Sequence, residues 1–123
     1  LAGPMQMLSG QVAERSRNQP EVSNANRWIG KTIDQAPELY KLAAPFQHFN
    51  KHSPPLLFMV GEHDAPERNK PTREKLAGLG IPTGVKVYAD GKHGCWNQNP
   101  WFGTMVADMD LFFQQHLRGK KSR

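Results

Sequence analysis

The stretch "PLLFMVGEHD", residues 55–64, decides the fold. Within it the apolar residues from Leu56 to Val60 follow two prolines and end at Gly61. A short, uninterrupted apolar run bounded by turn residues is typical of a strand buried on both faces, as in a parallel sheet covered by helices. The stretch therefore predicts a central strand whose carboxyl end is followed closely by Asp64.

The segments on either side of this strand predict an alternation of helix and strand. Apolar spacing and helix-ending residues predict helices within residues 34–45, 71–82 and 105–117, and a second strand within residues 84–90. The remaining segments are expected to be the end of a strand followed by a turn at Gly3-Pro4 over residues 1–8, a loop or short surface helix over 9–27, and a connector over 46–55. This order predicts the α/β class, with parallel strands and flanking helices.

Two residues suited to proton chemistry follow the two expected strands. Asp64 comes four residues after Val60 in "GEHD", and His93 comes four residues after Ala89 in "GKHG". The separation of 93 − 64 = 29 residues is enough for one helix and one strand. Adjacent parallel strands would bring the two side chains together at one sheet edge, where a carboxylate can orient an imidazole. Taken singly, Asp64 could instead cap a turn, and His93 could bond to backbone.

Residues 27–113 resemble the carboxyl-terminal part of α/β-hydrolase-fold serine esterases of the acetyl-xylan-esterase and feruloyl-esterase-like kind. The segments that carry the resemblance are "RWIGKTIDQAPELYKLAAP", "PPLLFMVGEHD" and "GIPTGVKVYADGKHGCWNQNPWF". The family order of serine, acid and histidine implies that Asp64 is the catalytic acid and His93 the general base. It also implies that residues 1–123 form the carboxyl-terminal portion of one hydrolase domain. In that portion, 1–55 is a strand end with a helical and loop excursion, and 56–118 holds the acid strand, a helix, the histidine strand and loop, and the last helix.

The sequence departs from the family pattern by an absence. No G-x-S-x-G motif and no Gly-rich oxyanion loop occur in it, and in the family both lie upstream. We therefore expect a fragment that is inactive alone, with the nucleophile in a missing amino-terminal half. The complete enzyme is expected to cleave carboxylic esters, plausibly on carbohydrates. A non-catalytic binding module of hydrolase shape and a peptidase of the same fold remain alternatives.

Aromatic and metal-ligating side chains near the histidine are further candidates. Trp96 and Trp101 could shape an acyl or sugar pocket, or could simply pack the loop after His93. The less favoured interpretations are a nucleophilic cysteine and metal binding, and they concern Cys95, the pair His48 and His52, and the pair Glu62 and His63. The resemblance implies neither a metal nor a cofactor.

Composition limits the classes of partner. The formal net charge of +5 includes a short basic tail, "RGKKSR", without the interleaved aromatic residues of a single-strand nucleic-acid binder. The single cysteine excludes an internal disulfide, and no apolar run approaches the length of a membrane span. We expect an ester substrate, no nucleic-acid or membrane partner, and self-association through an exposed sheet edge, for example as a homodimer. The compartment is undetermined, although the family resemblance favours a secreted or periplasmic protein.

Overall fold

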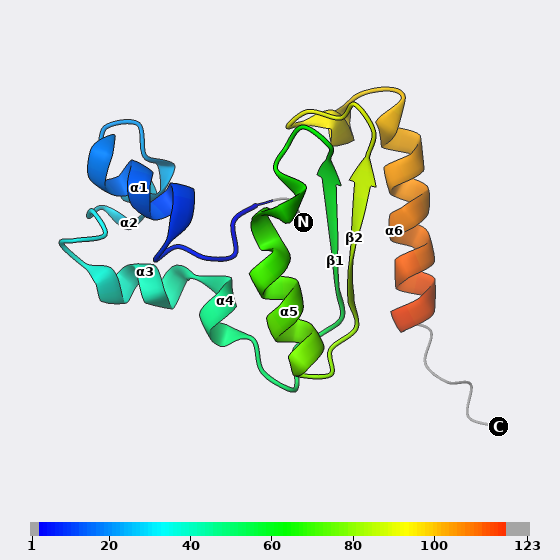
Figure 1. The fold of residues 1–123 in the computed structure, drawn as a ribbon, viewed down its shortest axis with the longest axis horizontal. Helices are drawn as coiled ribbons and strands as arrows, with labels where there is room; N and C mark the ends of the chain where they lie inside the picture. Colours follow the sequence, from blue (N-terminus) through cyan, green and yellow to red (C-terminus); the bar gives the residue numbers. More distant parts are fainter. Residues whose placement is uncertain (1–2, 118–123) are drawn as a thin grey trace. The chain divides into compact units, whose positions relative to one another are not determined.

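The computed structural model describes residues 3–117, and these form two compact units (Figure 1). The helical unit comprises residues 3–52, and the sheet unit comprises the described residues from 53 onward. The elements of the helical unit are α1 (Gly10–Asn18), α2 (Asn24–Ile29), α3 (Pro37–Ala43) and α4 (Pro45–His48). Those of the sheet unit are β1 (Leu56–Gly61), η1 (Pro66–Asn69), α5 (Lys70–Gly78), β2 (Thr83–Tyr88), η2 (Cys95–Asn97) and α6 (Trp101–Leu117).

The sheet unit contains two parallel strands joined by a helical crossover. β1 and β2 pair in register from Leu56 opposite Thr83 to Gly61 opposite Tyr88. Figure 1 shows the two strands pointing the same way between α5 and α6. Because parallel neighbours need a crossover connection, η1 and α5 carry the chain back to the start of β2. The expected α/β class, with parallel strands flanked by helices, is confirmed.

Apolar residues of the sheet unit meet between β2, α6 and the loop after β2. Met59, Tyr88, Cys95 and Met105 form a buried cluster, against which Leu57, Trp96 and Trp101 pack. Phe58 and Val60 of β1 are also buried, which is the two-sided burial that the apolar run predicts. α5 buries Leu76 completely, and its exit turns at Gly80, whose φ of +74° suits a residue without a Cβ. These contacts hold both strand ends in place.

A partly buried polar contact ties β2 to α6. The Tyr88 hydroxyl donates to Asp108 Oδ2 at 2.7 Å, and Lys86 Nζ lies 3.3 Å from Asp108 Oδ1. Burial raises the pKa of Tyr88 above its ordinary value, and the bond to the Asp108 carboxylate adds to this. The same hydrogen bond from Tyr88 holds the pKa of Asp108 below its ordinary range, with a further contribution from Lys86. α6 is therefore fastened to β2 by charge as well as by packing.

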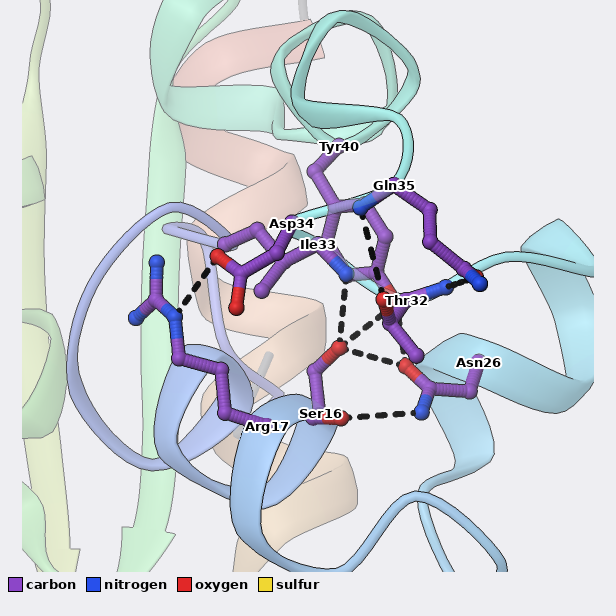
Figure 2. Close-up of polar contacts among 8 residues, drawn as sticks. All are labelled: Ser16, Arg17, Asn26, Thr32, Ile33, Asp34, Gln35 and Tyr40. Carbon is purple, nitrogen blue, oxygen red and sulfur yellow. Dashed lines mark hydrogen bonds and ion pairs between the residues drawn. The ribbon is translucent and has the colours of Figure 1, made fainter.

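A buried polar network holds the helical unit together (Figure 2). The Asn26 amide oxygen accepts from the hydroxyls of Ser16 and Tyr40, each at 2.5 Å, and the Asn26 amide nitrogen donates to the carbonyl of Ser16 at 3.1 Å. The Ser16 hydroxyl accepts from the backbone N–H of Ile33 at 2.9 Å. Ser16 and Tyr40 are fully buried, and Asn26 is nearly so. The network therefore joins α1, α2 and α3 around a polar centre.

Some expectations for the amino-terminal half are wrong. The described residues 3–8 form bends rather than a strand, and residues 1 and 2 of that expectation lie outside the described range. For residues 9–27, of the two structures expected, a loop or a short surface helix, the helix forms as α1, and most of α2 follows it. Pro45 ends α3 as expected, but it also begins α4 within the expected connector, since proline is well tolerated in a first helical turn.

Two expectations concern surfaces and edges. Within residues 3–117, β1 and β2 are the whole sheet, so each has an outer edge without a strand partner there. Self-association through such an edge stays a prediction. The last helix forms as expected, although of its apolar stripe only Met105 is buried. Among the described helices, none is long and apolar enough to cross a membrane.

Candidate active site

Asp64 is held in a tight turn at the carboxyl end of β1. Its backbone N–H donates to the carbonyl of Gly61 at 2.9 Å, and the next residue, Ala65, has a φ of +49°. The turn directs the chain into η1 and leaves the Asp64 side chain 7% exposed. A carboxylate buried to this degree is costly unless charged or hydrogen-bonding groups surround it. Its partners therefore determine what it can do.

His93 lies in the loop after β2 and reaches Asp64. The distance between His93 Nδ1 and Asp64 Oδ2 is 2.9 Å, within the range of a hydrogen bond. Because an ionised carboxylate can only accept, the bonded Nδ1 carries a proton, and in the neutral ring Nε2 is then the acceptor nitrogen. The His93 side chain is 75% exposed, which makes it accessible to a reacting group. The sequence-based expectation that these two side chains meet is confirmed as geometry.

A close backbone approach brings the two loops together. A Cβ on Gly61 would lie 2.3 Å from the carbonyl oxygen of Gly91, a separation that real side chains do not show. The N–H of His63 donates to that same carbonyl at 2.8 Å, and the N–H of Glu62 donates to the carbonyl of Tyr88 at 2.9 Å. Glycine at position 61 is thus required for the end of β1 to touch the histidine loop.

Arg68 is a part of the site that the sequence analysis missed. Its Nη2 lies 3.3 Å from Asp64 Oδ1, so the two oxygens of the carboxylate face different partners. Arg68 follows Asp64 by four residues, on η1, and its side chain is 30% exposed. The spacing of four residues between an aspartate and an arginine was the available signal. That signal is weak, because the segment "DAPERN" contains a proline and shows no helical apolar pattern.

The two tryptophans lie at the histidine loop and both pack on the core. The Trp96 ring meets the His93 ring edge-on, with the ring centroids 5.0 Å apart. The Trp101 indole N–H donates to the carbonyl of Ala89 at 2.8 Å. Both rings contact the buried cluster of the sheet unit. Packing of this loop is therefore one role of both residues, and contact with a substrate stays a prediction.

The less favoured candidates occupy different surroundings. Cys95 is 1% exposed within the apolar cluster. His48 Nε2 lies 2.6 Å from the carbonyl of Leu42. Glu62, His63 and Asp90 are exposed, and they each offer one ligand atom within 4.8 Å of the others, so these three could hold a metal ion. Sequence analysis had paired Glu62 and His63 but had not included Asp90, which comes from the other loop.

No described serine lies in a strand-to-helix turn, because all of them precede β1, the first described strand. Ser16 and Ser23 are buried in the helical unit, where Ser16 is committed to the polar network and Ser23 caps α2. Ser9 donates to the side chain of Gln6 at 2.8 Å. Ser122 lies outside the described residues. The absence of the G-x-S-x-G motif is thus matched by the surroundings of these serines.

Parallel strands flanked by helices, with an acid and a histidine meeting where the strands end, are typical of the α/β-hydrolase class. The sequence model of the BD-FAE family, an α/β-hydrolase family of feruloyl and acetyl-xylan esterases, matches residues 1–72. The chain belongs to this family, and the family implies an esterase acting on carbohydrate-linked esters. The matched residues include Asp64 and end before His93. No curated protein and no solved structure matches the chain.

Proposed function

We propose that Asp64 and His93 are the acid and the general base of a serine carboxylesterase that cleaves esters linked to carbohydrate. The observation that carries the proposal is the 2.9 Å contact between His93 Nδ1 and Asp64 Oδ2 at the ends of two paired parallel strands. It is supported by membership of an esterase family. The residues form the carboxyl-terminal portion of the hydrolase domain, and the serine and its oxyanion hole come from sequence outside these 123 residues.

The proposed chemistry follows from the direction of the hydrogen bond. Asp64 accepts from Nδ1, so Nε2 of His93 can take the proton of a serine hydroxyl as its oxygen attacks the ester carbonyl. The imidazolium then gives that proton to the departing alcohol, and an acyl-enzyme remains. Water attacks the acyl group by the same proton transfers and releases the acid. Asp64 stabilises the imidazolium in each half-reaction and needs no proton of its own.

The aromatic rings near His93 are proposed to shape the substrate site. Trp96 holds its ring beside the imidazole, where a flat apolar surface can contact an acyl group or a sugar ring. The Trp101 N–H is already occupied by the Ala89 carbonyl, so only its ring is available to a substrate. Both residues then combine packing of the histidine loop with contact to substrate. The chemistry uses neither a metal nor a cofactor.

The test is a comparison of variants in the complete parent enzyme. Replacement of His93 by alanine should lower the turnover of p-nitrophenyl acetate and of acetylated xylan by about 10⁴- to 10⁶-fold, the scale of a lost triad member. Asp64→Asn should lower turnover less, and His52→Ala, in an exposed turn of the helical unit, should leave it unchanged. Full activity of His93→Ala would rule out His93 as the base.

The 123-residue chain gives a second test of the same proposal. Without a serine in a nucleophile turn, this chain should turn over p-nitrophenyl acetate no faster than free histidine does. A rate that is well above that control, and that is lost in His93→Ala, would show that a nucleophile lies within these residues. The proposal that the serine lies elsewhere would then be wrong.

A further inference from the structure

Asp64 is shared between two cationic or potentially cationic groups, one on each of its oxygens. His93 Nδ1 lies 2.9 Å from Oδ2, and Arg68 Nη2 lies 3.3 Å from Oδ1. The carboxylate is 7% exposed, whereas the His93 side chain is 75% exposed. Asp64 is therefore the more buried residue of the Asp64–His93 dyad, and its charge is the one that most needs compensation from groups within the protein.

A dyad without the arginine would have an electrostatic defect. A carboxylate at such depth, with histidine as its one partner, gains most when that histidine is an imidazolium, because only then is the buried charge compensated. An imidazolium has no free nitrogen to accept a proton, so it cannot act as a general base. A guanidinium is always charged in proteins, and it can supply the compensation without being consumed in the reaction.

We propose that Arg68 is a positioning residue of the pair Asp64 and His93: its guanidinium compensates the buried Asp64 carboxylate, so that this compensation does not depend on a proton on His93. Arg68 also occupies Oδ1 and thereby resists rotation of the carboxylate, whose terminal torsion has broad minima. Oδ2 then stays directed at Nδ1. The inference rests on the proposed function for its meaning in catalysis, but the charge balance that it describes can be measured without any turnover.

The backbone of η1 sets the position of Arg68. The N–H of Arg68 donates to the carbonyl of Ala65 at 2.9 Å, and Ala65 adopts the left-handed conformation that starts the turn. A nearby arginine provides a matched comparison. Arg73 Nη2 lies 3.6 Å from Glu67 Oε2, and its Nη1 donates to the carbonyl of Pro66, so Arg73 pairs away from Asp64.

The charged groups that bear on a titration of His93 are few among the described contacts. Asp64 meets the imidazole from the loop after β1, and Arg68 meets Asp64 from η1. Trp96, the ring that contacts the imidazole from η2, is uncharged. Lys92 is the neighbour in the chain. Removal of the Arg68 charge is therefore expected to change the titration of His93 through Asp64.

The experiment is an NMR titration of the 123-residue chain labelled with ¹⁵N-histidine, with His93 assigned from a His93→Gln spectrum. In Arg68→Gln, the midpoint of the His93 titration should move upward by about 0.5 to 1 pH unit, because a compensating positive charge has been lost. Arg68→Lys should restore most of the difference, and Arg73→Gln should leave the midpoint in place. Backbone amide spectra of each variant report whether the sheet unit is still folded.

Each outcome decides the inference. An unchanged midpoint in folded Arg68→Gln overturns it. A downward movement to the midpoint of Asp64→Asn also overturns it, because it means that Asp64 has swung away and that Arg68 is merely structural. If Arg68→Gln unfolds the sheet unit, folded Arg68→Lys decides instead, and a midpoint equal to that of Asp64→Asn overturns the inference. In the parent enzyme, the acidic limb of the pH profile of kcat/KM should move in the same direction as the midpoint of the His93 titration. If the proposed esterase function is wrong, the NMR titration still tests the role of Arg68, because it requires no turnover.

Discussion

The two compact units differ in how much of their buried centre is polar. The sheet unit is centred on apolar side chains, including Phe58 and Leu76, each at most 1% exposed. The helical unit has a small apolar cluster of Ala13, Ile33 and Tyr40. Beside it lies a buried polar network in which a serine, an asparagine and the same tyrosine bond to one another and to backbone groups. Apolar side chains can shift slightly in a core with a moderate loss of stability, whereas each group of a buried polar network needs its hydrogen-bond partner in place. The two units should therefore respond differently to substitution.

The largest expected effect is a cavity in the sheet unit. Phe58→Ala removes a fully buried ring from β1 and should lower the free energy of unfolding by about 3 to 5 kcal/mol. Hydrogen exchange followed by mass spectrometry should show lost protection over β1, β2 and α5, with α1 and α3 retained. Val87→Ala is the matched control, because Val87 lies opposite Val60 in the register but is 48% exposed. Equal loss of protection in both units would show that they unfold together, and the comparison would fail.

The second expected effect is a broken network in the helical unit. Asn26→Ala removes the acceptor of two hydroxyls and the donor to two carbonyls, and unsatisfied buried groups of this kind should cost about 2 to 4 kcal/mol in total. Protection should be lost over α1, α2 and α3 and kept over β1 and β2. Asn24→Ala, at an exposed position of the same helix, is the control and should change little. If Asn26→Ala lowers the free energy of unfolding by less than Asn24→Ala does, the network contributes no net stability.

The same difference explains what sequence could predict. Leu56 to Val60 form an uninterrupted apolar run, so β1 and the parallel architecture could be predicted from burial alone. The meeting of Asp64 and His93 followed, since parallel neighbours align their carboxyl ends. Over residues 9–27 the sequence left a loop and a short helix open, because one of the two buried residues of α1, Ser16, is polar and finds partners ten and more residues away.

Arg68 was missed for a related reason. The ion pair with Asp64 depends on the turn at Ala65, whose left-handed backbone is unusual for a residue other than glycine. A pattern of residue types shows spacing but not backbone conformation. The contact between Gly61 and Gly91 is similar, since both glycines are visible in the sequence but only the folded backbone shows that they touch. Contacts that depend on the backbone conformation of one or two residues, such as these two, therefore cannot be predicted from sequence patterns.

The smallest expected effect is a pH dependence of stability in the sheet unit, where Asp108 is charged, that the uncharged polar network of the helical unit should not share. The pKa of Asp108 is held low by the hydrogen bond from Tyr88 and by Lys86. This carboxylate therefore adds stability above its unfolded pKa of about 3.9, and the contribution is lost as pH falls through the lower folded pKa. The serine, asparagine and tyrosine of the helical network carry no charge in acid, so a fall in pH should not break that network. Between pH 6 and pH 2, α6 and β2 should lose protection by about 1 kcal/mol or less, the scale of partly exposed ion pairs.

Asp108→Asn should abolish this part of the pH dependence, and Asp110→Asn, an exposed change on the same helix, should preserve it. An acid response confined to α1 and α2 would contradict the assignment of charge to one unit and of neutral polarity to the other.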